Sequence, residues 1–298
     1  MDRLREHFNI VCVRPDAYPA AGGLLVTASL LACALRRLGE PARVGINAFA
    51  HDATNIVIGA HLLEADVAST LPAGTIVFNT EPLDPDGGHA EGLRPFAERF
   101  RVWDYDPRNF VPLRALGNRA ADFVPVGYLP EMTSVVHRDD KDIDALFYGQ
   151  LSDHRRSVLG AIEKRGARVV WLHDVYGAAR DPWIGRAHIV LNLHYRPRAP
   201  FEAGRVAHLF ANRCTVVAES DAAGDIDADL AGGLAAAPAA AIPDLVLELL
   251  HDPARRATLA SEGFARIVRR DYCASVRHAL DARHRASGSV EREAAGPG

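Results

Sequence analysis

The sequence predicts an α/β protein with two doubly wound parallel sheets, and three observations support this prediction. Short, continuous apolar runs alternate with helical segments, which is typical of parallel sheets covered by helices on both faces. The alternation restarts after residues 126–142, where Gly, Pro and a run of charge predict a linker. Residues 242–284 are helical in pattern for most of their length. We therefore predict domains over 1–135 and 140–270, a C-terminal helix over 271–286 and a disordered tail over 287–298.

The first half supplies the strands and one long helix of the first domain. Phe8–Val13 reads "FNIVCV", a short β-rich run. A buried helix follows over residues 22–39, with Arg36 and Arg37 in its last turn and Gly39 at its end. Further strands are predicted over residues 42–46, 54–59, 74–79, 100–104 and 121–127.

The second half repeats the pattern. Strands are predicted over residues 143–149, 167–172, 188–195 and 214–219, and helices over 152–166 and 181–187. A further helix opens with Glu202 and Arg205 and ends near Asn212 and Arg213. An acid and a base at the start of a buried helix raise the question of what they bind.

Composition excludes several classes of protein. The chain has 298 residues, a net charge of −4 and a pI near 6.3, so nothing predicts binding to nucleic acid. The four cysteines show no spacing typical of metal ligands or of a disulfide framework. No run is long and apolar enough to span a membrane, and the N-terminus lacks a signal-peptide pattern. We expect a cytoplasmic protein, with peripheral membrane contact and oligomeric state left open.

Familiar catalytic motifs are missing. The sequence has no GxGxxG after its first strand, no phosphate loop, no GxSxG turn and no HExxH helix. The triplets "DYD", at Asp104, and "DID", at Asp142 and again at Asp225, pair two aspartates, and such pairs after a strand can hold a divalent metal against a diphosphate. Only Asp104 and Asp106 follow a predicted strand. No metal site is predicted, with this pair as the one alternative.

Polar residues recur directly after the predicted strands. Ligands of doubly wound sheets bind beyond the carboxyl ends of the strands, so such residues are candidate ligand contacts. In the first half they are Gly22, Gly23, Asn79 and Glu81, and in the second half Tyr148, Gly149, His173, Asp174, His194, Tyr195 and Glu219.

The second half resembles the C-terminal domain of GT-B glycosyltransferases, in particular bacterial and viral enzymes grouped with glycosyltransferase family 1 domains. The matching stretches cover most of residues 143–270: "DALFYGQLSDHRRSVL", "VVWLHDVYG", "HIVLNLHYRPRAPFEAGRVAHLFANRCTVVAES" and "HDPARRATLASEGF". In the first half, "PDAYPAAGGLLVTASLLACALRRLG" and "VFNTEPL" match less specifically. The resemblance implies two Rossmann-like domains facing a cleft, with the sugar nucleotide on the C-terminal domain and the acceptor on the N-terminal one.

The resemblance also implies roles for individual residues. Glu202 is expected to accept hydrogen bonds from a ribose diol, and Arg205, on the same helix face, to meet the diphosphate. Arg155 or Arg156 is expected to reach the same phosphates. The complete donor-side prediction is Tyr148, Gly149, Arg155, His173, Asp174, Tyr176, His194, Tyr195, Phe201, Glu202, Arg205 and Glu219, with His173 and Asp174 near the base and Tyr176 stacked on it.

The sequence departs from the pattern of many retaining GT-B enzymes, which carry two glutamates around this helix. The second position falls on Phe210 or His208, depending on the alignment, so a retaining mechanism does not carry over. An inverting enzyme needs a base, for which Asp16, His51 and Glu81 are candidates. Gly22, Gly23 and Asn79 are predicted on the acceptor side.

The resulting functional prediction is a glycosyltransferase. It would move a sugar from a nucleotide diphosphate sugar to a hydroxyl acceptor without a metal or another cofactor. Two alternatives stay open: a GT-B-like protein that binds a nucleotide or glycan without turnover, and a sugar-nucleotide epimerase. Neither the sugar nor the acceptor follows from the sequence.

Overall fold

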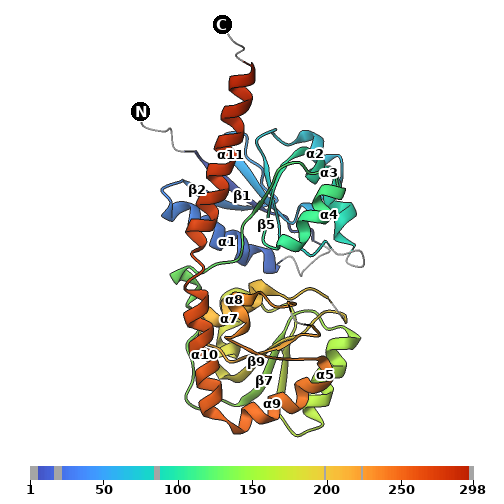
Figure 1. Cartoon of the computed structure of the whole chain (residues 1–298), viewed down its shortest axis with the longest axis vertical. Coiled ribbons are helices and arrows are strands. Elements are labelled where there is room, and N and C mark those ends of the chain that lie inside the picture. The colour runs from blue at the N-terminus through green and yellow to red at the C-terminus, as the bar shows by residue number, and fades with distance from the viewer. Residues whose placement is uncertain (1–5, 17–21, 84–87, 198, 223, 295–298) are drawn as a thin grey trace. The chain divides into compact units, whose positions relative to one another are not determined.

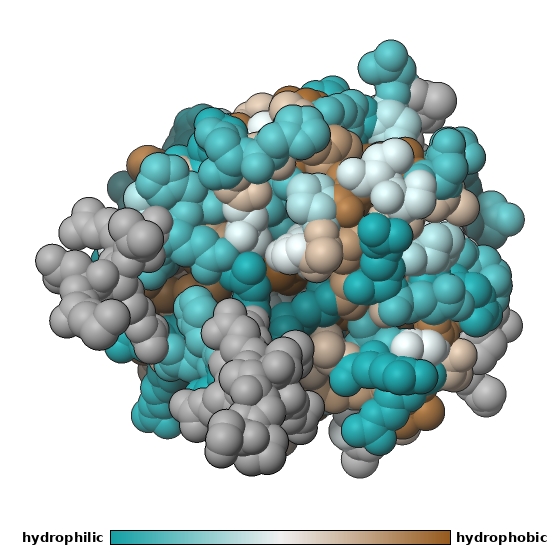
Figure 2. Space-filling view, turned by 90° about the horizontal axis from the view of Figure 1, so that it is seen from above, coloured by the Kyte–Doolittle hydropathy of each residue, from teal (hydrophilic) through white to brown (hydrophobic). Residues whose placement is uncertain are grey.

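The computed structural model describes residues 6–16, 22–83, 88–197, 199–222 and 224–294, with the backbone alone from 286 onward. The chain divides into two compact units. Unit 1 comprises Met1–Pro125 and Asp271–Gly298, and unit 2 comprises Val126–Arg270. No helix in the described residues is long and apolar enough to cross a membrane. On the face displayed in Figure 2, hydrophilic residues predominate and the apolar ones form small separate areas.

Unit 1 is built on a parallel sheet with the strand order β2-β1-β3-β4-β5-β6. Its strands are β1 (Phe8–Cys12), β2 (Ala42–Ile46), β3 (Thr54–Ile58), β4 (Ile76–Asn79), β5 (Arg101–Asp104) and β6 (Ala121–Phe123). The helices are α1 (Gly22–Arg37), α2 (Val67–Thr70), α3 (His89–Arg99) and α4 (Phe110–Ala115), with short 3₁₀ turns η2 (Ala60–Leu62) and η3 (Pro107–Asn109).

The inner strands β1, β3, β4 and β5 of unit 1 are mostly buried because helices cover the sheet (Figure 1). Every residue of β1 is buried, as the continuous run "FNIVC" predicts. Leu93, Phe96 and Ala97 of α3 pack against Val57 and Val77 of the sheet. The strand order turns back at β1, which pairs with both β2 and β3. Doubly wound sheets bind ligands at such points, beyond the carboxyl ends of the strands.

The C-terminal helix α11 (Tyr272–Ala294) belongs to unit 1, where it contacts α1. Arg283 of this helix pairs with Glu6, with 2.5 Å between Nη1 and Oε1. The helix corrects the predicted boundary at residue 286, because it continues to Ala294 through most of the predicted tail. A single Gly and two Ser do not end a helix that regains the helix formers Glu, Arg and Ala.

Unit 2 is built on a second parallel sheet, with the strand order β11-β10-β9-β7-β8. Its strands are β7 (Ile143–Tyr148), β8 (Val169–Leu172), β9 (Ala187–Asn192), β10 (Val216–Glu219) and β11 (Ala235–Ala237). Its helices are α5 (Asp153–Glu163), α6 (Asp181–Arg186), α7 (Ala203–Ala211), α8 (Ala228–Ala231), α9 (Ile242–His251) and α10 (Pro253–Ile267). The two sheets confirm the predicted α/β class; the sequence prediction missed only the short edge strand β11 among these strands.

The predicted linker over residues 126–142 is part of unit 2. The side chain of Asn212, at the end of α7, makes three hydrogen bonds to this segment and one to its own helix. Its Oδ1 accepts from the backbone N–H groups of Ser134 and Val135, both at 2.8 Å. Its Nδ2 donates to the carbonyls of Met132 and His208, both at 2.8 Å. Composition predicted a linker here, and one buried amide on a distant helix pairs with three backbone groups of this segment.

Candidate functional site

The predicted donor-side residues of unit 2 collect at the carboxyl ends of its parallel strands. Gly149 follows β7, His173 and Asp174 follow β8, His194 follows β9, and Glu219 ends β10. Parallel strands point their carboxyl ends to one edge of the sheet, so sheet topology alone brings these distant residues to one edge. The N-termini of α5 and α7 start from the loops at this edge, after β7 and β9.

A carboxylate held between two arginines lies at the centre of this edge. Glu202 precedes α7 and pairs with Arg205, with 2.6 Å between Oε2 and Nη2. Its other carboxylate oxygen, Oε1, accepts from Nη2 of Arg155, which α5 contributes. Glu202 is 37% exposed at its side chain, whereas the two arginine side chains are 4% and 9% exposed. Two nearly buried guanidinium groups therefore share one accessible anion.

Arg155 is enclosed by backbone carbonyls. Its Nε donates to Leu193 O at 3.1 Å and its Nη2 to the same oxygen at 2.8 Å, while Nη1 donates to Gln150 O at 2.8 Å. Burial lowers the pKa of Arg155, and the neighbouring Glu202 counteracts that shift. Arg155 thus joins the loops after β7 and β9 and holds Glu202, and its contact with a phosphate stays a prediction.

Arg205 lies over two aromatic rings of β7. Its Cζ is 5.2 Å from the ring centre of Phe147 and 5.0 Å from that of Tyr148. Nη1 is 3.4 Å from Asn192 Oδ1 at the end of β9. Gly149 has a φ of +126°, and a Cβ there would lie 3.0 Å from Arg205 Nη2. Glycine is required at this turn both for its backbone conformation and for the approach of the guanidinium.

Three buried polar groups at this edge have no hydrogen-bond partner among the described residues. They are the hydroxyl of Tyr148, Nδ2 of Asn192 and both ring nitrogens of His194. Buried polar atoms are nearly always paired, so such a group at a strand end indicates a position where water or a ligand binds. Burial raises the pKa of the Tyr148 hydroxyl, which keeps it protonated and able to donate.

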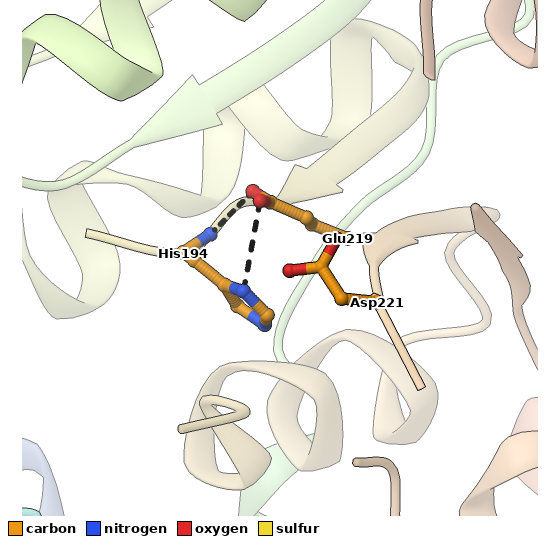
Figure 3. Close-up of side chains that lie close together, drawn as sticks. All are labelled: His194, Glu219 and Asp221. Atoms are coloured by element: carbon orange, nitrogen blue, oxygen red, sulfur yellow. Dashed lines mark hydrogen bonds and ion pairs between the residues drawn. The ribbon is translucent and has the colours of Figure 1, made fainter. Parts of the chain in front are cut away.

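Glu219 organises a second group, shown in Figure 3. His154 Nε2 is 2.7 Å from Glu219 Oε1, and the backbone N–H of His194 donates to Oε2 at 3.0 Å. The Nδ1 atom of His194 lies 3.6 Å from Oε1. The sequence prediction included Glu219 and His194 but missed His154, whose position as the second residue of α5 carries no signal in the sequence.

The same group is the candidate metal centre among the described residues. His194, Glu219 and Asp221 offer ligand atoms that all lie within 4.8 Å of one another (Figure 3). However, both oxygens of Glu219 already have hydrogen-bond partners: Oε1 pairs with His154 Nε2, and Oε2 accepts from the backbone N–H of His194. This arrangement favours a carboxylate that orients the two histidines.

An aromatic surface follows β8. Trp171 is 41% exposed, and its Nε1 donates to Gly149 O at 2.8 Å, which joins β8 to the glycine turn. Its ring lies 5.6 Å from that of His173. Asp174 has a φ of +53° and accepts from the hydroxyl of Tyr176 at 3.2 Å. The sequence prediction named the last three residues and missed Trp171, which projects from the strand itself.

Other predicted donor residues differ in exposure. Tyr195 is 49% exposed, and its ring centre lies 5.4 Å from Arg155 Cζ. Arg156, the alternative to Arg155, is exposed on α5. Phe201 corrects the prediction, because it is fully buried and offers no surface to a ligand. An apolar residue before a buried helix anchors that helix instead.

The two positions where a second glutamate was sought are both occupied by packed side chains. Phe210 is fully buried. His208 lies 3.4 Å from Asp181 of α6, and burial lowers the pKa of its imidazole. Ser134 donates to the same aspartate at 2.6 Å. These contacts make His208 part of the packing between α6 and α7.

In unit 1, the DxD aspartates are enclosed by the protein. Asp104 is fully buried and accepts from Asn79 Nδ2 at 2.8 Å, from Asn109 Nδ2 at 3.0 Å and from the Asp106 backbone at 2.8 Å. Burial raises the pKa of Asp104 to about 7. Asp106 accepts from both the backbone and the side chain of Arg108. The alternative of a metal on this pair loses its support, because these oxygens face donors within the protein.

The network of Asp104 holds Glu81. The carbonyl of Glu81 accepts from Asn79 Nδ2 at 2.8 Å and from Asn109 Nδ2 at 3.0 Å, and its N–H donates to Asn79 Oδ1 at 3.3 Å. Asn79 itself is buried. The sequence prediction placed Asn79 on the side of the substrate that receives the sugar. In the structure its side chain is hydrogen-bonded to the backbone of Glu81.

The other first-half candidates come from different segments of unit 1. Asp16 is exposed after β1. His51 is exposed and directly precedes Asp52 and Ala53, which line a small hollow with the residues at the amino ends of β1 and β2. The prediction for His51 is corrected, because the chain returns from the end of β2 to the start of β3 and His51 lies on that return. Gly22 and Gly23 form the first turn of α1, and the loop before them lies outside the described residues.

Comparison with known proteins gives the fold a name. No protein-family model matches the chain, and no curated protein matches it. Sucrose-phosphate synthase from Thermosynechococcus elongatus is similar over 98% of this chain and 100% of its own, with a TM-score of 0.58 and 15% identity. HepE of Anabaena, solved with UDP-glucose, is similar over 93% and 99%, with a TM-score of 0.61 and 14% identity. A variant of T4 phage BGT, also solved with UDP-glucose, is similar over 94% and 99%, with a TM-score of 0.56 and 11% identity.

The likeness covers nearly the whole of each chain, and these structures are GT-B glycosyltransferases. The identities are too low to transfer an activity. The two parallel sheets, their helices and this likeness show that the chain belongs to the proteins of the GT-B fold.

Proposed function

We propose that this protein is a glycosyltransferase that takes a sugar from a nucleoside diphosphate sugar bound at unit 2. The observation that carries the proposal is the carboxylate of Glu202 between Arg155 and Arg205, at the strand ends and beside the N-termini of two helices. Each element of this arrangement matches one part of such a donor: a ribose diol, a diphosphate and a flat base.

The diphosphate is assigned to Arg205 and the unpaired donors beside it. Arg155 and Arg205 carry two positive charges and Glu202 one negative charge, so the group keeps a net positive charge. Arg205 presents a planar fork that suits phosphate oxygens, and the N-terminus of α7 adds backbone N–H groups. Asn192 Nδ2 and Tyr148 Oη supply two further buried donors. These protein donors support a transfer that needs no metal.

The base and the ribose are assigned to the surface after β8 and to Glu202. The half-exposed indole of Trp171 and the neighbouring His173 form an edge on which a flat base can stack. Glu202 keeps more than a third of its side chain exposed and can accept from a diol while bound to both arginines. HepE and BGT, which share the fold, were solved with UDP-glucose, so UDP-sugars are the first donors to test.

The acceptor is assigned to unit 1, where a hydroxyl group must lose a proton. Of the three candidate bases, Glu81 is the one whose backbone a buried network holds just beyond β4. Asp16 and His51 are exposed. The sugar and the acceptor are left open.

The first experiment is a thermal-shift panel of nucleotides and sugar nucleotides, followed by calorimetry with UDP and UDP-glucose. Binding of a nucleoside diphosphate is expected, and it should be stronger than binding of the matching monophosphate. Each bound donor is then incubated with the protein, and the products are separated by mass and anomeric form.

The three functional alternatives give different outcomes in these assays. Hydrolysis or transfer of the sugar supports the transferase. Tight nucleotide binding without any turnover would favour a binding protein, and an epimerised donor without transfer would favour an epimerase. No binding of any nucleotide would refute the proposed site.

A further inference from the structure

Unit 1 carries a cluster of three ionisable side chains, His61, Glu81 and His89. Only Glu81 has been considered above, and the two histidines have no assigned role. His61 comes from η2 after β3, Glu81 follows β4, and His89 begins α3. The Nε2 atom of His89 lies 3.8 Å from Glu81 Oε2. The rings of His61 and His89 meet edge to face, with centroids 5.0 Å apart. The sequence analysis named only Glu81, because the two histidines are 28 residues apart.

Packing fixes the positions of these three residues. A Cβ at Gly92 of α3 would lie 2.6 Å from the carbonyl oxygen of His61, so glycine allows α3 to approach η2 closely. Asn79 and Asn109 hold the carbonyl of Glu81, and the buried Asp104 holds both amides. Pre-organisation of this kind is what a catalytic group needs, and a surface ion pair does not need it.

Access and charge also suit a proton acceptor. The side chains of His89 and Glu81 are 30% and 28% exposed, so a substrate hydroxyl can reach them. His61 is more enclosed, and burial lowers its pKa to about 4, which keeps it neutral at pH 7. His89 lies in the first turn of α3, an eleven-residue helix. Its neighbouring carboxylate would stabilise the imidazolium once a proton arrives.

We propose that His89 is the general base that takes the proton of the acceptor hydroxyl, and that Glu81 positions its ring. This proposal rests on the proposed function. The O–H bond of the acceptor breaks and its proton passes to a ring nitrogen of His89. The acceptor oxygen forms a bond to the anomeric carbon of the donor sugar, while the bond between that carbon and the diphosphate oxygen breaks. The diphosphate leaves with the electron pair, and this single displacement inverts the anomeric centre.

The test compares matched pairs of variants in the full chain. His89→Ala is paired with His278→Ala, which removes an exposed histidine of α11 in unit 1. Glu81→Gln is paired with Glu91→Gln, which removes a carboxylate from the exposed surface of α3. Circular dichroism and UDP affinity, measured for all four, verify that folding and donor binding are intact.

His89→Ala is expected to lower kcat by about 10²–10⁴-fold with UDP affinity unchanged, whereas both controls stay within about threefold of the parent. Glu81→Gln is expected to lower kcat less than His89→Ala and to shift the acidic limb of the kcat profile to lower pH. The same shift should be visible in the NMR titration of His89, which needs no substrate. The product should have an inverted anomeric centre.

Several results would overturn the proposal. Normal turnover of His89→Ala is one, and a larger loss of kcat in Glu81→Gln than in His89→Ala is another. An NMR titration of His89 that is the same in the parent and in Glu81→Gln, or a product of retained configuration, would also overturn it. Absence of turnover in the parent protein with every donor is a separate result, which would refute the proposed function. An active parent whose His89→Ala variant is equally active would refute this inference alone.

Discussion

Replacing Arg155 by Met tests whether this arginine is a support of the site rather than a phosphate contact. Methionine approximates the length of the arginine stem without its charge or its donors. The substitution leaves the carbonyls of Leu193, His194 and Gln150 without their donor, and Glu202 without one of its two partners. The effect on stability should therefore exceed the effect of losing a surface ion pair.

The magnitude follows from these contacts. Each of three buried or partly buried carbonyls loses a charge-assisted hydrogen bond, at about 1–1.5 kcal/mol apiece. The ion pair with Glu202 adds little to the sum, because that carboxylate is 37% exposed and keeps Arg205. The free energy of unfolding of unit 2 should fall by about 3–4.5 kcal/mol. Arg156→Met, on the exposed side of α5, should change it by less than about 0.5 kcal/mol.

Urea unfolding combined with hydrogen exchange read by mass spectrometry measures this effect separately in each unit. Faster exchange is expected in the loops after β7 and β9, and unit 1 should be unaffected. If Arg155→Met keeps the stability of the parent while its UDP affinity falls a hundredfold, the reasoning is wrong and Arg155 is a direct phosphate contact.

The remaining predictions concern affinity, metal and stability. Arg205→Ala should weaken UDP binding by about ten- to hundredfold, from the loss of about 1.5–3 kcal/mol, and unchanged affinity in calorimetry would remove Arg205 from the site. Turnover should survive EDTA, and loss of activity with rescue by Mn²⁺ would show that a metal takes part. Asn212→Ala should lower the stability of unit 2 by about 2–3 kcal/mol, because Ser134 and Val135 lose their acceptor; an unchanged urea midpoint would contradict that role. Burial raises the pKa of Asp104 from 3.8 to about 7, so the folded state binds the proton more tightly and stability should fall as the pH rises from 3.8 to about 7. Asp104→Asn should remove that component, and the same pH dependence in the variant would contradict the assignment.

Much of the fold followed from local pattern. The continuous apolar runs predicted the strands, because a strand of a parallel sheet is buried on both faces. Glu202 and Arg205 could be found from the sequence as well, since both lie on one turn of one helix. The residues after the strands were also predictable as a set, because sheet topology brings them to one edge.

Only the tertiary structure decided which of these residues are exposed and which are supports. Arg155 and Arg205 look alike in the sequence, but the carbonyls after β7 and β9 enclose the first. Asp104 belonged to the one alternative metal site that the sequence offered, but Asn79 and Asn109 donate to it. His61 and His89 have no common motif, because they meet through the packing of α3 on η2. A sequence determines the types and order of side chains, whereas burial and hydrogen-bond partners depend on segments that are distant in the chain.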